Sequence, residues 1–405
     1  DEEELGLAAA DRTFVESEYG VRIGCAAQIG ENTVIEGAVQ IGCGAVIRAG
    51  SVVRADIPPY CIAEGAPARV VKAFSPCEGR WLEIADEAAL ARLLQERQET
   101  PPLLTYAFIT YNRSRYLRKS LKSVLQQVGG DPLVEVLVSD NASTDDTREL
   151  VQEMQAQYRN LGYHCNEENV GAEGNIHEAI LRSRGEYVIV AGDDDYLLDG
   201  ALHVVLDNIR KYRGAALFHL RRENTPRRVY KDRGIVPYIA YVGYHMTWIG
   251  GIVWRRELYQ LIREPHKYDH TRLPQVYMQL EMLRKNPQFV ILYGMFLTEG
   301  TGECIPSGFN FGEIFIKNYL DILMTASEIP PYLLSDEKKR LMDELIYDCL
   351  EKIVQYQHDL DLDGIFDIVR GHYAAEPYYE EVVARLQEIL QADEAGDKAQ
   401  PDETR

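Results

Sequence analysis

The chain has no run of about 18 consecutive apolar residues, so no transmembrane helix is expected. Its first residues, DEEELGLAAADRTF, have no basic segment followed by a continuous apolar one, so no signal peptide is expected either. The seven cysteines are scattered and odd in number, which indicates a reducing cytoplasm rather than a disulfide framework. Basic residues are outnumbered, 43 against 64 acidic. The formal net charge of −21 argues against nucleic acid as a bulk partner and against general attraction to anionic lipid.

At 405 residues, with 46% apolar and 26% charged residues, the chain is long enough for two or three globular domains. Changes in residue pattern along the chain predict where those domains end. The predicted parts are a repeat domain over residues 1–74, a helical linker over 75–101, an α/β domain over 102–305, an α-helical region over 306–392 and a disordered acidic tail over 393–405.

A six-residue repeat dominates the first part. One aliphatic residue recurs at every sixth position without a miss, at Ile23, Ile29, Ile35, Ile41, Ile47 and Val53. A short repeat with one aliphatic residue per unit is typical of a β-helix, because stacked coils bury the aliphatic column. The sequence therefore predicts a small β-helix at the N-terminus.

This repeat, together with the segment DIPPYCIAEGAPARVVKAF at residues 56–74, resembles the left-handed β-helix of the hexapeptide-repeat acyltransferases. The resemblance covers about residues 15–74 and implies trimerisation, with an acyl-CoA site at the end of the domain. Those enzymes use a histidine as general base, whereas this chain has no histidine before His164. We therefore favour a role chiefly in trimerisation, and keep acyl transfer as the alternative.

Strand and helix patterns alternate through the next part of the chain, which predicts a mostly parallel sheet. The expected strands are residues 104–110, 134–139, 161–165 and 186–191. The expected helices are residues 114–127, 145–159 and 173–183. The carboxyl ends of such strands form one edge of the sheet, where α/β proteins bind their ligands.

Polar residues follow these strands, and the densest group is the run Asp193, Asp194 and Asp195. Three adjacent carboxylates are costly to hold together without a cation, and Mg²⁺ or Mn²⁺ prefers such oxygen ligands. A divalent ion here would also supply the positive charge that an acidic protein needs to bind a nucleotide diphosphate. The pattern favours a site for a nucleotide diphosphate and a metal.

Four segments carry a more specific resemblance: LLTYAFITYNRSRYL, VEVLVSDNASTDDT, NEENVGAEGNIHEAI and GEYVIVAGDDDYLLDG. They resemble the family 2 glycosyltransferases, which have the Rossmann-like GT-A fold, and in particular the abequosyltransferase-like branch. The resemblance implies metal-dependent, inverting transfer of a sugar from a nucleotide diphosphate sugar. It is firm over about residues 104–200.

The resemblance also implies roles for single residues. Thr110, Tyr111 and Asn112 would contact the nucleoside, Arg113 the diphosphate and Asp140 the base ring, while helix capping is the alternative for Asp140. Asn169, Gly171 and Asn175 match an NxGxxxN element that would approach the ligand. Asp193 would contact the ribose, and Asp194 or Asp195 would bind Mn²⁺ or Mg²⁺.

Transfer to a hydroxyl also requires a general base. The family often has a Glu-Asp pair at a helix start after a WxGG-like segment, but no such pair follows the segment TWIGGIVWRREL here. We predict Asp269 as the base, with His270 as the second choice. Trp248, Gly250 and Gly251 would form the acceptor platform, although a core tryptophan is an equal alternative.

Together these features predict a glycosyltransferase that builds a surface polysaccharide, such as a capsule or O-antigen. Its expected partners are a nucleotide diphosphate sugar and a glycan or lipid-linked glycan acceptor, and its expected assembly is a homotrimer. The expected location is the cytoplasm, with peripheral contact at the inner face of the plasma membrane. The alternatives are a bifunctional glycosyltransferase/acyltransferase and a trimeric glycan-binding scaffold without catalysis.

Overall fold

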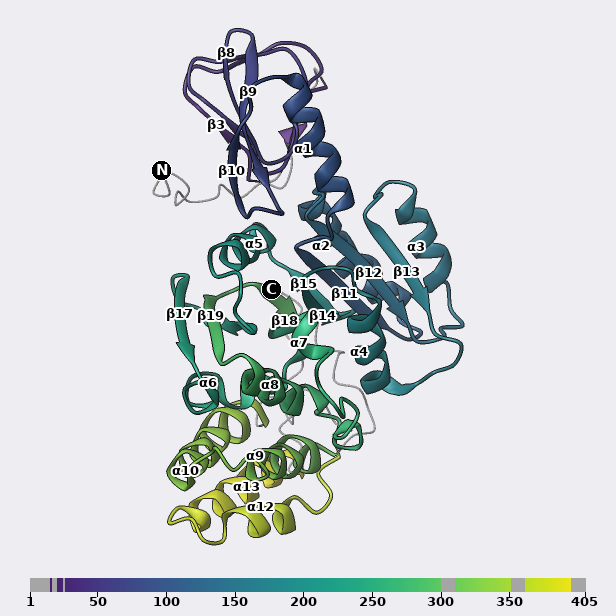
Figure 1. Ribbon diagram of the computed structural model, residues 1–405. Coiled ribbons are helices and arrows are strands. Elements are labelled where there is room, and N and C mark those ends of the chain that lie inside the picture. The colour runs from purple at the N-terminus through teal and green to yellow at the C-terminus, as the bar shows by residue number, and fades with distance from the viewer. Residues whose placement is uncertain (1–14, 17–19, 25, 300–309, 351–360, 395–405) are drawn as a thin grey trace.

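In the computed structural model, the chain places an N-terminal strand-rich region above an α/β core, and a group of helices lies below that core (Figure 1). The residues described by the structure are 15–16, 20–24, 26–299, 310–350 and 361–394. The predicted acidic tail therefore lies outside the described residues from position 395 onward. None of the helices in the described ranges combines the length and the apolar character that crossing a bilayer requires.

The six-residue repeat forms short strands that pair in parallel with the strand 18 positions further along the chain, as Arg22 with Gln40 and Val34 with Val52. The pairs are β2 (Arg22–Ile23) with β5 (Gln40–Ile41), β3 (Gln28–Ile29) with β6 (Val46–Ile47), and β4 (Val34–Ile35) with β7 (Val52–Val53). Ile41, Ile47 and Val53 are buried, whereas Ile29 in the preceding turn is exposed. Each turn of the repeat is thus covered by the next one.

The sheet that contains β3 and β6 continues past residue 74. Strand β8 (Cys61–Gly65) pairs in parallel with β6, and β9 (Ala68–Ser75) and β10 (Arg80–Glu83) follow it in antiparallel order. Helix α1 (Glu87–Glu99) begins at Asp86, whose side chain accepts a hydrogen bond from the Ala89 backbone N–H. Its Leu93 is buried in the core of the N-terminal region. In the predicted linker, residues 80–83 therefore belong to the N-terminal sheet, and α1 packs against that sheet.

The α/β core contains the four expected strands, which are parallel: β11 (Leu104–Thr110), β12 (Val134–Asp140), β13 (Leu161–Cys165) and β14 (Tyr187–Gly192). Four further strands complete an eight-stranded sheet in the order β13-β12-β11-β14-β18-β16-β19-β17. These are β16 (Leu217–Arg222), β17 (Arg228–Arg233), β18 (Ile252–Arg255) and β19 (Gln288–Gly294). Strand β18 is antiparallel to both of its neighbours, so the sheet is mixed beyond β14.

Helices cover both faces of this sheet. One face packs against α2 (Ser114–Val128), α3 (Thr147–Gln155) and α5 (Ala201–Lys211). The other packs against α4 (Gly171–Arg182), α6 (Ile235–Val242), α7 (Arg256–Tyr259) and α8 (Pro274–Lys285). Tyr60 and Phe74 of the N-terminal region join the first of these cores, and the Arg210 guanidinium lies 4.3 Å from the Tyr60 ring centroid. The N-terminal region is therefore packed directly on the α/β core.

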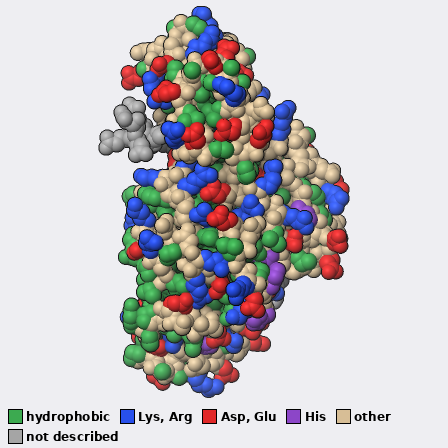
Figure 2. Space-filling view, in the orientation of Figure 1, with side chains coloured by type: hydrophobic (Ala, Val, Ile, Leu, Met, Phe, Trp, Pro, Cys, Tyr) green, Lys and Arg blue, Asp and Glu red, His purple; other side chains and the backbone are tan. Residues whose placement is uncertain are grey.

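The predicted helical region is confirmed at the C-terminal end of the described chain. It comprises a π-helical segment Gly312–Asn318, α9 (Tyr319–Met324), α10 (Pro331–Arg340), a second π-helical segment Leu341–Leu350, α12 (Ile365–Tyr373) and α13 (Tyr379–Glu394). Its buried residues share one core with α6 and α8. On the face drawn in Figure 2, acidic and basic side chains are interspersed, and hydrophobic side chains gather over α6 and α10.

Candidate functional site

The predicted polar residues meet at one edge of the sheet because three parallel strands end there. Thr110 at the end of β11 pairs with Asp140 at the end of β12, and Ile109 pairs with Gly192 at the end of β14. The chain then enters the run Asp193–Asp195, which we call the acidic corner. Helix α2 holds this run in place, since Ser120 Oγ donates a hydrogen bond of 2.7 Å to the Asp193 carbonyl.

Arg113 neutralises much of the charge of the acidic corner. Its Nε lies 2.8 Å from Asp193 Oδ1 and its Nη2 lies 2.6 Å from Asp194 Oδ2. Thr110 Oγ1 donates a further hydrogen bond of 2.8 Å to Asp193 Oδ2. Burial raises the pKa of Asp193 to about 6, although Arg113 and Thr110 act in the opposite direction. Four predicted site residues thus form one cluster, in which Arg113 contacts carboxylates.

The third carboxylate of the corner faces the segment predicted to bind the acceptor. Asp195 is buried, and a Cβ atom on Gly250 would lie only 2.6 Å from its Oδ2. A Cβ on Gly251 would likewise lie 2.7 Å from the Trp248 ring. The absence of a side chain at Gly250 thus lets this segment approach the acidic corner, and at Gly251 it leaves room for the Trp248 ring. Trp248 itself is partly buried against the core, so its ring contributes to packing as well.

The loops after β11 and β12 are joined to each other. Asn112 accepts a hydrogen bond of 2.7 Å from the Thr144 N–H and donates its own N–H to Ser143 Oγ at 2.9 Å. Asp140 is buried and accepts hydrogen bonds from the Ser143 N–H and the Tyr163 hydroxyl. Its carboxylate thus caps the turn, and Tyr111, in the loop after β11, is exposed.

The NxGxxxN residues divide into a surface pair and a buried one. Asn169 accepts a hydrogen bond from Asn141 at 2.7 Å and another from the Gly171 N–H at 2.9 Å, which starts α4. Asn175 is buried, and its side chain accepts from Ser139 Oγ and donates to the Ser139 carbonyl. Asn175 therefore holds α4 against β12, whereas Asn169 and Gly171 lie nearer to the surface.

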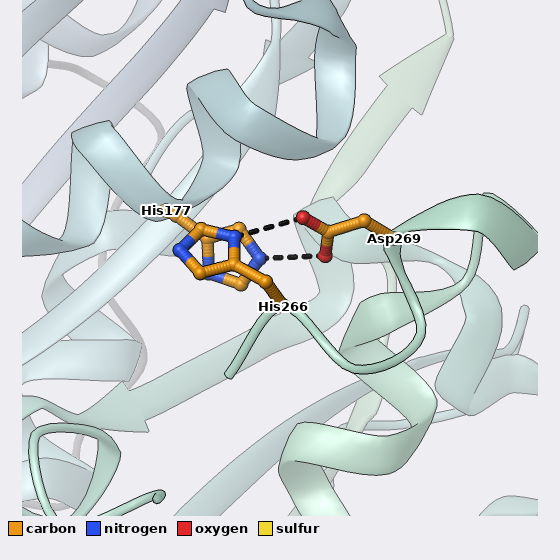
Figure 3. A group of neighbouring side chains, drawn as sticks. All are labelled: His177, His266 and Asp269. Carbon is orange, nitrogen blue, oxygen red and sulfur yellow. Dashed lines mark hydrogen bonds and ion pairs between the residues drawn. The ribbon is translucent and has the colours of Figure 1, made fainter. Parts of the chain in front are cut away.

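The predicted base Asp269 lies in a cluster that includes two histidines, His177 and His266, absent from the predicted site (Figure 3). Its Oδ1 is 2.9 Å from His177 Nε2, and its Oδ2 is 2.8 Å from His266 Nδ1. We call these three residues the imidazole cluster. The second predicted base, His270, instead stacks on Tyr268 with ring centroids 6.2 Å apart.

The imidazole cluster joins parts of the chain that the sequence does not relate. His177 lies on α4, His266 in the loop after α7, and Asp269 in the short helix Asp269–Thr271. His177 is fully buried, which lowers its pKa, and its Nδ1 lies 2.6 Å from the Tyr259 hydroxyl. A single histidine on a helix has the same sequence pattern as a core residue, so no local signal marked it.

The α/β core of the chain matches a known protein family. Residues 107–272 match the family model described as Glycosyl transferase family 2. This range contains the acidic corner, the segment around Trp248 and the imidazole cluster. The predicted family 2 glycosyltransferase domain is confirmed, so this part of the chain is an enzyme domain of the glycosyltransferase class.

Two curated relatives are similar over part of their length. Abequosyltransferase RfbV from Salmonella typhimurium is 25% identical over 207 residues, which cover 44% of this chain and 61% of the relative. GalNAc(5)-diNAcBac-PP-undecaprenol beta-1,3-glucosyltransferase from Campylobacter jejuni is 36% identical over 106 residues, covering 26% of this chain and 34% of the relative. The chain thus spans less than two thirds of either relative.

Among solved structures, TarS from S. aureus in complex with UDP-GlcNAc aligns with 72% of this chain and 90% of its own, at 15% identity and a TM-score of 0.47. A maltose O-acetyltransferase from Clostridium difficile 630 is 47% identical over 13% of this chain and 28% of its own, with a TM-score of 0.13.

Proposed function

We propose that this chain, which carries a family 2 glycosyltransferase domain, moves a sugar from a nucleotide diphosphate sugar to a hydroxyl of a surface-polysaccharide acceptor. The observation that carries the proposal is the convergence of Thr110, Arg113 and Asp193–Asp195 at the carboxyl edge of the sheet. A buried group of carboxylates beside one arginine suits a ligand made of a cation and a diphosphate.

The donor site is proposed at this edge. Asp194 and Asp195 would hold Mn²⁺ or Mg²⁺, because their oxygens are the hard ligands that these ions prefer. The ion would stabilise the charge of the leaving nucleoside diphosphate. Arg113 lies within reach of the same place and would transfer its hydrogen bonds from carboxylate to phosphate. Tyr111, Asn112 and Asp140 would contact the nucleoside.

The acceptor site is proposed between Trp248 and Asp269. Gly250 lies against Asp195, and Gly251 lies against the Trp248 ring, so an acceptor bound at this segment would be next to the donor sugar. Gln275 at the start of α8 connects this segment to the helix that follows Asp269 in the chain, since its Nε2 donates a hydrogen bond of 2.6 Å to the Thr247 carbonyl. Asp269 would accept the hydroxyl proton, and attack opposite the diphosphate would invert the anomeric carbon.

The N-terminal region is proposed to be a left-handed β-helix that forms a homotrimer. The parallel pairing of strands 18 residues apart supports a three-sided coil. The N-terminal region has no histidine to act as general base, which argues against acyl transfer. A bifunctional glycosyltransferase/acyltransferase is therefore only the second candidate. The buried contacts of Tyr60 and Phe74 with the α/β core would let such a trimer fix the spacing of its three transferase domains.

The acceptor class and the location are proposed from the relatives and the surface. The names of both relatives describe transferases, and one includes an undecaprenol-linked acceptor. Tyr241 on α6 and Tyr332 on α10 are 44% and 65% exposed. Figure 2 shows apolar side chains gathering over these two helices. Such residues suit a cytoplasmic enzyme that touches the inner face of the plasma membrane to reach a lipid-linked glycan.

The test begins with a thermal-shift screen of UDP, GDP, CDP and dTDP with Mn²⁺, because a ligand of the native state raises its stability. Hydrolysis of the matching donor is then measured with and without EDTA. We expect Asp194→Ala and Asp195→Ala to lower turnover by about 1,000-fold, and the exposed control Asp199→Ala to leave it unchanged. Undiminished turnover in EDTA and in both variants would overturn the metal role.

A further inference from the structure

We propose that the imidazole cluster is a binding site for a borderline divalent transition ion, best suited to Zn²⁺, formed by His177, His266 and Asp269. One nitrogen from each histidine and a carboxylate oxygen lie within 4.8 Å of one another. Two imidazoles and one carboxylate are a ligand set that binds Zn²⁺ in catalytic sites.

The geometry of the donors supports a shared ion. His177 Nε2 and His266 Nδ1 approach different oxygens of the same carboxylate, and the two ring centroids are 4.0 Å apart at an angle of 55°. Figure 3 shows the Asp269 carboxylate pointing at both rings, so the three donor groups converge. Small movements of exposed side chains would bring all three donors to one ion.

The surroundings of His177 are those of a metal ligand. The ring is buried on α4, and burial lowers its pKa, which favours the neutral form that can coordinate a metal. Its other nitrogen, Nδ1, is held by the Tyr259 hydroxyl at 2.6 Å. Histidine ligands of metals commonly have their second nitrogen fixed in this way, which sets the tautomer and the ring orientation.

The other two ligands give the ion access from solvent. The His266 side chain is 61% exposed and Asp269 is 28% exposed, so an ion can enter without unfolding the helix that carries His177. With three protein ligands, a four-coordinate ion keeps one position for water. Binding would connect α4 to the loop after α7 and thus stabilise the native state.

The ligand types separate this site from the acidic corner. Imidazole nitrogen favours Zn²⁺, Ni²⁺ and Cu²⁺, whereas an all-carboxylate site suits Mg²⁺ and Mn²⁺. The inference therefore goes beyond the proposed transferase activity, and a binding measurement that needs no substrate can test it.

The experiment uses the full chain, cleared of metal with EDTA, in excess Mg²⁺ that occupies oxygen-only sites. Calorimetry measures Zn²⁺ binding, and Co²⁺ absorption spectra report nitrogen coordination. We expect one ion per chain, with affinity about 100-fold lower in His266→Ala. His270→Ala, in the same loop but outside the cluster, and Asp194→Ala should both retain this site.

Two results would overturn the proposal. One is wild-type protein that binds no Zn²⁺ in excess Mg²⁺, which would mean that hydrogen bonds alone hold the cluster. The other is a His266→Ala protein that binds Zn²⁺ as tightly as the wild type. His266 is exposed, so its replacement should leave the fold intact, and Asp269→Asn provides a second variant that retains the side-chain shape. Both variants should lose the increase in melting temperature that Zn²⁺ gives to the wild type.

Discussion

The acidic corner and the imidazole cluster both hold carboxylates near the edge of one domain, but they balance negative charge in different ways. Asp193 and Asp194 share the guanidinium of Arg113, a permanent cation. Asp269 is held by two imidazoles, which are good metal ligands when they are neutral. The difference shows how one chain can present two sites with distinct ion preferences, one built from hard oxygen ligands and one that includes nitrogen.

The largest expected effect comes from removing the cation of the acidic corner. In Arg113→Met, Asp193 and Asp194 lose their partner, so the metal-free protein should melt at a lower temperature and Mn²⁺ should stabilise it more than it stabilises the wild type. Donor turnover should fall on the order of 1,000-fold, because a positioned positive group near the diphosphate is lost. Thermal melts with and without Mn²⁺, and donor kinetics, measure both effects.

Arg118→Met is the matched control for this variant. Arg118 lies on α2, the helix that begins directly after Arg113, and its ion pair with Glu153 is exposed, so its loss should change stability and turnover very little. Equal Mn²⁺ stabilisation and equal turnover in Arg113→Met and in the wild type would contradict the role given to Arg113. The imidazole cluster should be unaffected in both variants, and Zn²⁺ binding checks this.

Glu337 on α10 is a buried acid outside both clusters, and it forms an ion pair with Arg340. Its Oε1 accepts a hydrogen bond of 2.8 Å from Tyr319, and Arg340 lies 3.1 Å from Oε2. Burial raises the pKa of Glu337 from 4.5 to about 7. Its contribution to stability is therefore complete below pH 4.5 and is lost as the pH rises through 7, about 3 kcal/mol in all.

Urea unfolding at pH 5 and pH 8 measures this loss. In Glu337→Gln the part of the loss that comes from Glu337 should be absent, because the amide does not ionise; the smaller part that comes from Asp193, whose pKa burial also raises to about 6, should remain. Glu380→Gln, on the exposed side of α13, should retain the pH dependence of the wild type. If Glu337→Gln loses stability with pH as steeply as the wild type, another group is responsible.

Local patterns were sufficient for the first half of the α/β core. The strand expected at 104–110 is β11, and the strand expected at 134–139 is β12 with one more residue, because hydrophobic periodicity is a local property. The helix expected at 173–183 begins earlier, at Gly171, since Asn169 accepts a hydrogen bond from the Gly171 N–H. The position of β18 between β14 and β16 depends on pairing between distant segments, which no local pattern contains.

The candidate site likewise has one part that local sequence patterns predict and another that depends on tertiary packing. The meeting of Thr110, Arg113 and Asp193 could be predicted because the ends of parallel strands share one edge of the sheet. Asp269 was predicted as the base from its place before a helix, and this role stays a prediction. The approach of His177 to Asp269 depends on how α4 packs against a loop 92 positions further along the chain, from 177 to 269. Such tertiary contacts leave no periodic signal in the sequence.

The smallest expected effect joins the two sites. If Zn²⁺ occupies the imidazole cluster, it takes the oxygens that Asp269 needs to accept the proton of the acceptor. Turnover supported by Mn²⁺ should therefore fall about 10-fold at a Zn²⁺ concentration ten times its dissociation constant. The measurement is the rate of transfer to an acceptor without Zn²⁺ divided by the rate with Zn²⁺. In His266→Ala this ratio should be close to one, whatever the basal rate of the variant.

The variant separates this effect from exchange of Mn²⁺ for Zn²⁺ at the acidic corner, because that exchange would inhibit His266→Ala and the wild type equally. If Zn²⁺ binds the cluster and wild-type transfer is unchanged, the proposed metal site stands, but Asp269 is excluded as the base. The proton would then have to go to another group on the acceptor side. In that case the two clusters would differ in function as well as in ligand type, and only the acidic corner would take part in catalysis.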